Sequence, residues 1–133
     1  MLRGTLALAG TMAVVAAIDL VHKAGTQAAY FHARSAIYVV VVLGLAAVWT
    51  GAILATGSLS MAVGGGVLAG GALGNLLSLA LWPGVPNPIE LDPIAFNLAD
   101  VFVLSGFLFT VAAALVFALR NRERLGEPVR LAR

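Results

Sequence analysis

The sequence contains no cysteine, which excludes disulfide bonds, thiolate metal ligands and cysteine nucleophiles. Charged residues are also scarce, at 11% of the 133 residues, whereas 61% are hydrophobic. Because soluble domains have about 25% charged residues, a water-soluble fold could not hide this much apolar surface. The small net charge of +2 gives no indication of a nucleic-acid partner. The composition therefore predicts an integral membrane protein surrounded by lipid.

The apolar residues gather in four runs, each long enough for a spanning helix of about 20 residues. We expect these helices at about 5–21, 35–55, 60–82 and 97–119. The prediction is an all-α integral membrane fold, a four-transmembrane-helix bundle over residues 1–119 with a basic cytoplasmic tail at 120–133. The first run also has the basic start and small residues of a secretory signal, but Asp19 fits poorly in a signal core.

The distribution of basic residues predicts the orientation of these helices. Four crossings place both termini on one side of the membrane, and that side carries Arg3 and the arginines of the tail. The opposite side has only Lys23 and Arg34. By the positive-inside rule, both termini are expected in the cytoplasm. The loop at 83–94, whose prolines favour turns and extended structure, then lies at the outer face.

Small residues recur every four positions in the third run, at Gly66, Gly70, Gly74 and Ser78. This spacing places them on one helix face, where they allow another helix to approach closely. Asn75 lies beside this stripe, and an amide at this depth most often bonds a neighbouring helix. Packing is the simplest interpretation of both features.

Acidic residues near the outer face are open to two interpretations. Asp19 and Lys23 are four residues apart, which suits an ion pair on one helix face. Asp100 begins an apolar helix and either caps it or takes part in chemistry. Asp92 and Asp100 are the outer-face aspartates separated by a short segment, and two carboxylates sharing a site can divide the roles of acid and base. His22 and His32 lack a nearby carboxylate, so we expect no metal.

Two motifs resemble a known family. Gly70-Gly-Ala-Leu-Gly-Asn75 and Phe96-Asn-Leu-Ala-Asp100 look like the paired signature of the bacterial lipoprotein signal peptidases, signal peptidase II. Asp19-x-x-x-Lys23 is similar to that family's first motif. The order of the motifs, the four expected spans and the cytoplasmic termini agree with the resemblance.

The resemblance implies an aspartic endopeptidase of the bacterial cytoplasmic membrane that removes signal peptides from diacylated prolipoproteins and needs no cofactor. It implies that Asp100 is one member of the catalytic dyad, with Asn97, Asn75, Asp19 and Lys23 binding substrate or supporting the site. The other aspartate of the family's dyad precedes the Phe-Asn motif in a Val-Asp-Phe-like context. Asp92 is the candidate for that role in this chain.

The chain also departs from the family pattern. After Asn75 the pattern continues to an Asp-Arg pair, whereas this chain has Ser78 and Leu79. The segment 22–34 is expected to be too short for the family's Asn-x-Gly-like motif and small outer sheet. These departures favour an alternative, a catalytically inactive four-helix scaffold or assembly subunit with a membrane-protein partner. A small transporter or channel has less support, because the helices lack a string of charges.

Overall fold

A computed structural model describes residues 2–125 of the chain. Its long helices are α1 (Leu2–Gly25), α2 (Ala36–Thr56), α3 (Leu59–Leu81) and α4 (Leu98–Arg120), and a short helix α5 (Arg122–Leu125) follows. The four long helices are each long and apolar enough to cross a membrane. The prediction of an all-helical bundle with four spanning helices is therefore confirmed. Of the expected basic tail, Arg130 and Arg133 lie outside the described residues.

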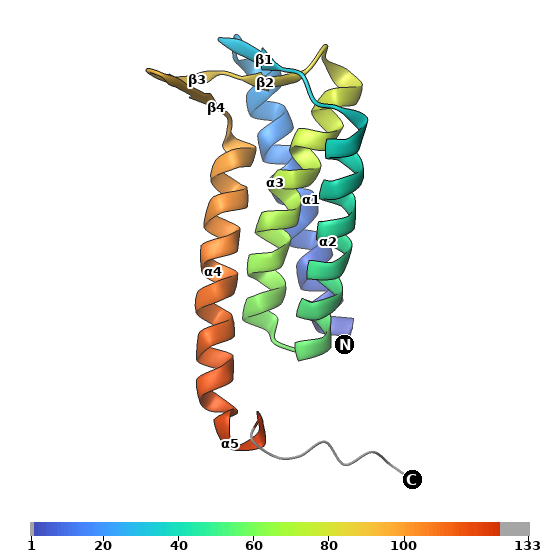
Figure 1. Ribbon diagram of the computed structural model, residues 1–133, viewed down its shortest axis with the longest axis vertical. Coiled ribbons are helices and arrows are strands. Elements are labelled where there is room, and N and C mark those ends of the chain that lie inside the picture. Colours follow the sequence, from blue (N-terminus) through green and yellow to red (C-terminus); the bar gives the residue numbers. More distant parts are fainter. Residues whose placement is uncertain (1, 126–133) are drawn as a thin grey trace.

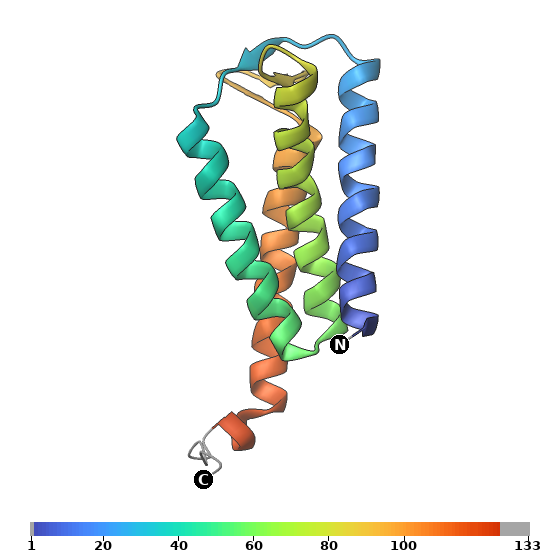
Figure 2. The ribbon, with the colours of Figure 1, turned by 90° about the vertical axis from the view of Figure 1, so that its right-hand side faces the viewer.

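The third helix is the centre of the bundle. It runs between α1 and α2, with α4 against its remaining side (Figures 1 and 2). In its most apolar window 56% of the residues are buried, compared with 22% or less in each of the other spanning helices. The N-terminus and the last turns of α4 lie at one end of the bundle, and the strands lie at the other (Figure 1).

Glycine makes this central position possible, because α3 has neighbours too close for side chains. A Cβ atom at Gly66 or Gly70 would lie 2.7 Å from a backbone carbonyl oxygen of α1. The expected small-residue stripe therefore packs against α1. Gly71 belongs to a second face, on which a Cβ atom would lie 2.5 Å from the carbonyl oxygen of Ala99 in α4. Close approach on two faces explains why the helix tolerates so many glycines.

The turn between α2 and α3 is built from Gly57 and Ser58. Gly57 has a positive φ of 66°, which a glycine adopts without steric cost, and its N–H donates to the carbonyl of Leu54. Ser58 is the N-cap of α3, and its side chain accepts a hydrogen bond from the N–H of Met61. The turn therefore ends one helix and starts the next within two residues.

Two small sheets lie at the other end of the bundle (Figure 1). Strand β1 (Tyr30–His32) pairs antiparallel with β2 (Val85–Asn87), and β3 (Ile89–Leu91) pairs with β4 (Ile94–Phe96). The expectation that the segment 22–34 is too short for a small sheet was wrong. That segment needs to supply only one strand, because its partner comes from the proline-rich loop before α4.

Candidate active site

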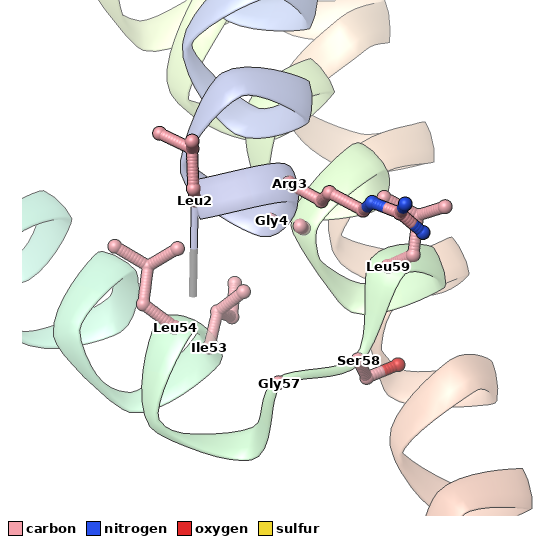
Figure 3. A pocket seen from close by; sticks show the side chains of 9 residues that line it. Leu2, Arg3, Gly4, Ile53, Leu54, Gly57, Ser58 and Leu59 are labelled. Atoms are coloured by element: carbon pink, nitrogen blue, oxygen red, sulfur yellow. The ribbon is translucent and has the colours of Figure 1, made fainter.

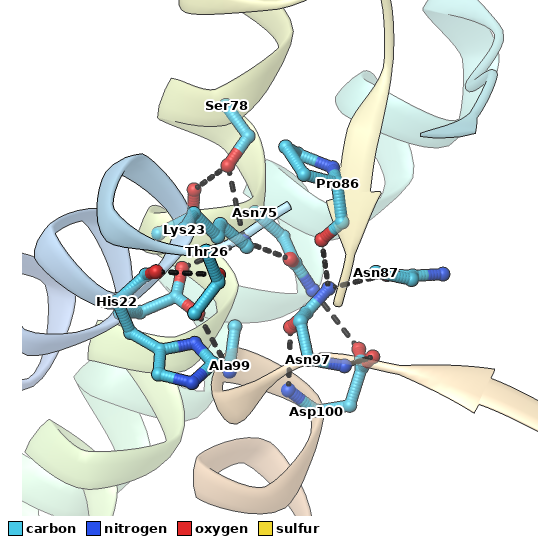
Figure 4. Close-up of polar contacts among 12 residues, drawn as sticks. His22, Lys23, Thr26, Asn75, Ser78, Pro86, Asn87, Asn97, Ala99 and Asp100 are labelled. Atoms are coloured by element: carbon cyan, nitrogen blue, oxygen red, sulfur yellow. Dashed lines mark hydrogen bonds and ion pairs between the residues drawn. The ribbon is translucent and has the colours of Figure 1, made fainter. Parts of the chain in front are cut away.

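A buried ion pair forms the base of a polar cluster between α1, α3 and α4. Lys23 Nζ lies 2.7 Å from Asp19 Oδ2, and both side chains are fully buried. The ammonium group also donates to Asn75 Oδ1 at 2.8 Å and to Ser78 Oγ at 3.0 Å (Figure 4). These contacts use all three ammonium hydrogens. The charge is therefore fully satisfied by the protein, as it must be where no water is available.

The carboxylate of Asp19 connects the first helix to the fourth. While Oδ2 binds Lys23, Oδ1 accepts a hydrogen bond of 2.9 Å from the backbone N–H of Ala99, in the first turn of α4. An anion at a helix N-terminus satisfies a free N–H group and interacts favourably with the helix dipole. The sequence predicts the pairing of Asp19 with Lys23, but the bond to α4 depends on tertiary structure.

Asn75 joins this ion pair to Asp100. Its Oδ1 accepts from Lys23, and its Nδ2 donates to Asp100 Oδ1 at 3.0 Å. The two contacts need an acceptor on one side and a donor on the other, so an amide fits this position and a carboxylate does not. The side chain of Asn75 therefore both links neighbouring helices and supports Asp100.

Asp100 and Asn97 form a capping box at the start of α4. Asn97 Oδ1 accepts from the N–H of Asp100 at 3.1 Å, and Asp100 Oδ2 accepts from the N–H of Asn97 at 3.2 Å. Asp100 thus has a hydrogen bond at each carboxylate oxygen. Asp100 was expected to cap α4. It does so as the N3 residue of the capping box, and Asn97 is the N-cap.

Asn87 is a member of the cluster that sequence reasoning missed. Its Oδ1 accepts a 2.7 Å hydrogen bond from Asn97 Nδ2, and its own Nδ2 donates to the carbonyl of Ala95 at 3.3 Å. Its exposed fraction is 5%. The available signal was an asparagine between Pro86 and Pro88, which hold the chain extended. That signal indicates a rigid strand but not which side chain it faces.

Asp92, the sequence candidate for the second catalytic aspartate, is exposed and lies at the turn between β3 and β4. At about 3.3 Å per residue, the length of β4 separates this turn from Phe96 by about 10 Å. The hairpin projects away from the helices (Figure 1). Because Leu91 pairs with Ile94, Asp92 is held at the far turn of the hairpin, and the structure does not bring it to Asp100.

An apolar groove leads to the polar cluster. It has a volume of about 400 Å³ and is lined by side chains of α2, α3 and α4, including Leu45, Trp49 and Phe107. Trp49 and Phe107 stack with their ring centroids 6.0 Å apart. Asn75 and Asp100 also line this groove, whereas Asp19 and Lys23 do not. A ligand in the groove would therefore meet the carboxylate of Asp100, the amide of Asn75 and a wall that is mostly apolar.

The described residues contain no group of three or more histidine, aspartate or glutamate side chains that could hold a metal ion. His22 belongs to α1, whereas His32 belongs to β1. His32 contacts Arg34, with 3.3 Å between Nε2 and Nη1.

The family model described as Signal peptidase (SPase) II matches residues 4–116. The chain belongs to the signal peptidase II family. The match includes most of each long helix and every residue of the polar cluster, and it confirms the family indicated by the motifs. Comparisons with curated proteins and with solved structures gave no match.

The position of Ser78 shows how this member of the signal peptidase II family accommodates a departure from the family pattern. Ser78 Oγ accepts from Lys23 and donates to the carbonyl of Gly74 at 2.7 Å. Where the family pattern has an acidic residue, serine therefore gives Lys23 a neutral acceptor. Lys23 keeps a full set of acceptors with Asp19 as its one carboxylate partner among the described residues.

Proposed function

We propose that this signal peptidase II family member binds diacylated prolipoproteins at the outer face of the bacterial cytoplasmic membrane, with both termini in the cytoplasm. The signal helix of the substrate occupies the groove between α2 and α4, and the region around the cleavage site lies at Asp100. The lipid tails of the substrate remain in the bilayer. The family match, the apolar lining of the groove and the excess of basic residues near the termini support this proposal.

We further propose that the chain binds this substrate without cleaving it. The observation that carries this step is the surroundings of Asp100. Hydrolysis by two aspartates requires two carboxylates that share a site and differ in protonation. Here the neighbours of Asp100 in the cluster are the amides of Asn75 and Asn97, and the next side chain is the amide of Asn87. Asp19 is neutralised by Lys23.

A second candidate function is the aspartic endopeptidase itself, with Asp92 and Asp100 as the dyad. It is favoured by the position of Asp100, which is held by two hydrogen bonds at the polar end of the groove. In this mechanism one aspartate accepts a proton from the attacking water, and the other donates a proton to the leaving amine. The β3–β4 hairpin must then fold toward the groove when substrate binds.

One assay of binding and cleavage separates the two functions. The purified full-length protein is incubated in lipid nanodiscs with a diacylated prolipoprotein, and bound and cleaved substrate are measured separately. We expect wild-type protein to bind without cleavage. Ala46→Phe, which fills the groove, should weaken binding at least tenfold, whereas Ala47→Phe on the exposed face of α2 should not. Equal binding by the two variants would contradict the groove as the substrate site.

The cleavage arm uses aspartate and asparagine variants. Cleavage by wild-type protein that is lost in both Asp92→Asn and Asp100→Asn would establish the endopeptidase and refute binding without cleavage. If binding without cleavage is correct, Asn87→Asp should introduce cleavage, because it places a second carboxylate against Asn97 and next to Asp100. Adding Asp100→Asn to that variant should remove the gained activity, and Asn87→Ala should show none.

A further inference from the structure

A second pocket lies at the opposite end of the bundle from the polar cluster. It has a volume of about 580 Å³, is open on one side and is lined by the first turn of α1, the last turns of α2 and the turn before α3. Leu2, Ile53 and Leu54 form apolar walls on one side of it (Figure 3). The cavity does not reach Asp100 or the substrate groove, so the proposed function leaves it unexplained.

Arg3 brings a positive charge to this cavity. Arg3 lines it together with Leu59, in the first turn of α3 (Figure 3). The one ion pair among the described residues is that of Asp19 with Lys23, so Arg3 has no carboxylate partner there. The first turns of α1 and α3 contain no acidic residue. Among the residues that the structure describes, this arginine therefore lies at a partly apolar pocket without a carboxylate partner.

The start of α3 adds to the positive potential that Arg3 creates at this pocket. The first N–H groups of a helix lack partners within it and point outward from the N-terminus, where the helix dipole is positive. Ser58, the N-cap, also lines the cavity and has a hydroxyl proton to donate. A negatively charged group at this position would interact with the guanidinium, the helix end and the hydroxyl at once.

We propose that this cavity holds one anionic phospholipid, with its phosphate against Arg3 and the start of α3. The acyl chains run along Leu2, Ile53 and Leu54. The location supports a lipid as the source of the anion, because the ends of spanning helices lie where phospholipid headgroups meet hydrocarbon. A headgroup of net negative charge fits better than a zwitterionic one, whose ammonium group would add a further cation beside Arg3.

The proposal is tested by lipid retention in native mass spectrometry of the full-length protein. The protein is exchanged into detergent with equal amounts of phosphatidylglycerol and phosphatidylcholine. We expect one phosphatidylglycerol to remain bound to the wild-type protein. Arg3→Gln should reduce this retention about fivefold, the effect of one basic residue at an anionic lipid headgroup. Arg3→Lys should keep most of it.

A matched control is Arg34→Gln, which removes the same charge at the other end of the bundle. It should retain phosphatidylglycerol as wild-type protein does. Gly4→Leu, which projects into the cavity without a change of charge, should reduce retention. Equal retention of the two lipids, an equal loss in Arg34→Gln, or displacement of the lipid by free glycerol 3-phosphate would each overturn the proposal.

Discussion

The two ends of the bundle differ in the partners that they provide for a basic side chain. At the strand end, Lys23 and Asp19 are buried together, and every hydrogen of the ammonium group has an acceptor in the protein. At the end that holds the N-terminus, Arg3 is exposed beside a cavity of about 580 Å³. Among the described residues, only the first site carries its complete set of partners. On our lipid proposal, the second is completed from the surrounding bilayer.

The largest effect expected from this comparison follows from removing Lys23. Lys23→Met leaves the carboxylate of Asp19 buried without its counter-ion, which should destabilise the fold by about 3–5 kcal/mol. The free energy of unfolding is measured by titration with a denaturing detergent. The double variant Asp19→Asn with Lys23→Met should recover part of this loss, because the amide oxygen introduced at position 19 would still accept from the N–H of Ala99. A single variant as stable as wild-type protein would contradict a tightly coupled buried pair.

A smaller effect is expected from the packing beneath the cluster. Gly71→Ala would place a methyl group 2.5 Å from the carbonyl oxygen of Ala99, and backbone atoms cannot rotate away. We expect a loss of about 1–3 kcal/mol from overpacking. Gly44→Ala in α2 is the matched control, because a Cβ atom there would have no neighbour within 4 Å. Equal melting temperatures for the two variants would show that α3 and α4 are less closely packed than the structure indicates.

The smallest effect is expected from Arg3→Gln in detergent without anionic lipid. Because Arg3 has no ion pair with a described residue, its removal should change the free energy of unfolding by less than about 0.5 kcal/mol. Added phosphatidylglycerol should raise the melting temperature of wild-type protein more than that of the variant. A large loss of stability without lipid would mean that Arg3 has a partner in the protein, and the contrast between the two ends would disappear.

The sequence predicts the helices of this protein better than it predicts the site. Apolar runs of about 20 residues have only one reasonable backbone structure in a bilayer, so the four spans follow directly. The pairing of Asp19 with Lys23 also follows, because residues four apart share a helix face. Both predictions use information that is local in the chain.

The remainder of the site depends on contacts between distant segments. Asn75 and Asp100 were grouped by family resemblance, and their direct hydrogen bond emerges only when α3 and α4 pack through Gly71. Asn87 was missed because nothing local shows that β2 turns its side chain toward Asn97. The segment from Asp92 to Asp100 is long enough for the two side chains to meet, but pairing of β3 with β4 holds Asp92 at the far turn. Strand pairing therefore explains both why Asn87 belongs to the site and why Asp92 does not.

The polar cluster also determines which helix of the bundle is free to move. Asp19 bonds α1 to α4, and Asn75 bonds α3 to α4, so separating these three helices at the strand end would break several buried hydrogen bonds together. Among the described residues, no side chain of α2 belongs to that network. Only 6% of the residues in its most apolar window are buried, and the glycine turn at Gly57 connects it to α3. Swinging α2 outward is therefore the least costly way to open the groove sideways to the bilayer.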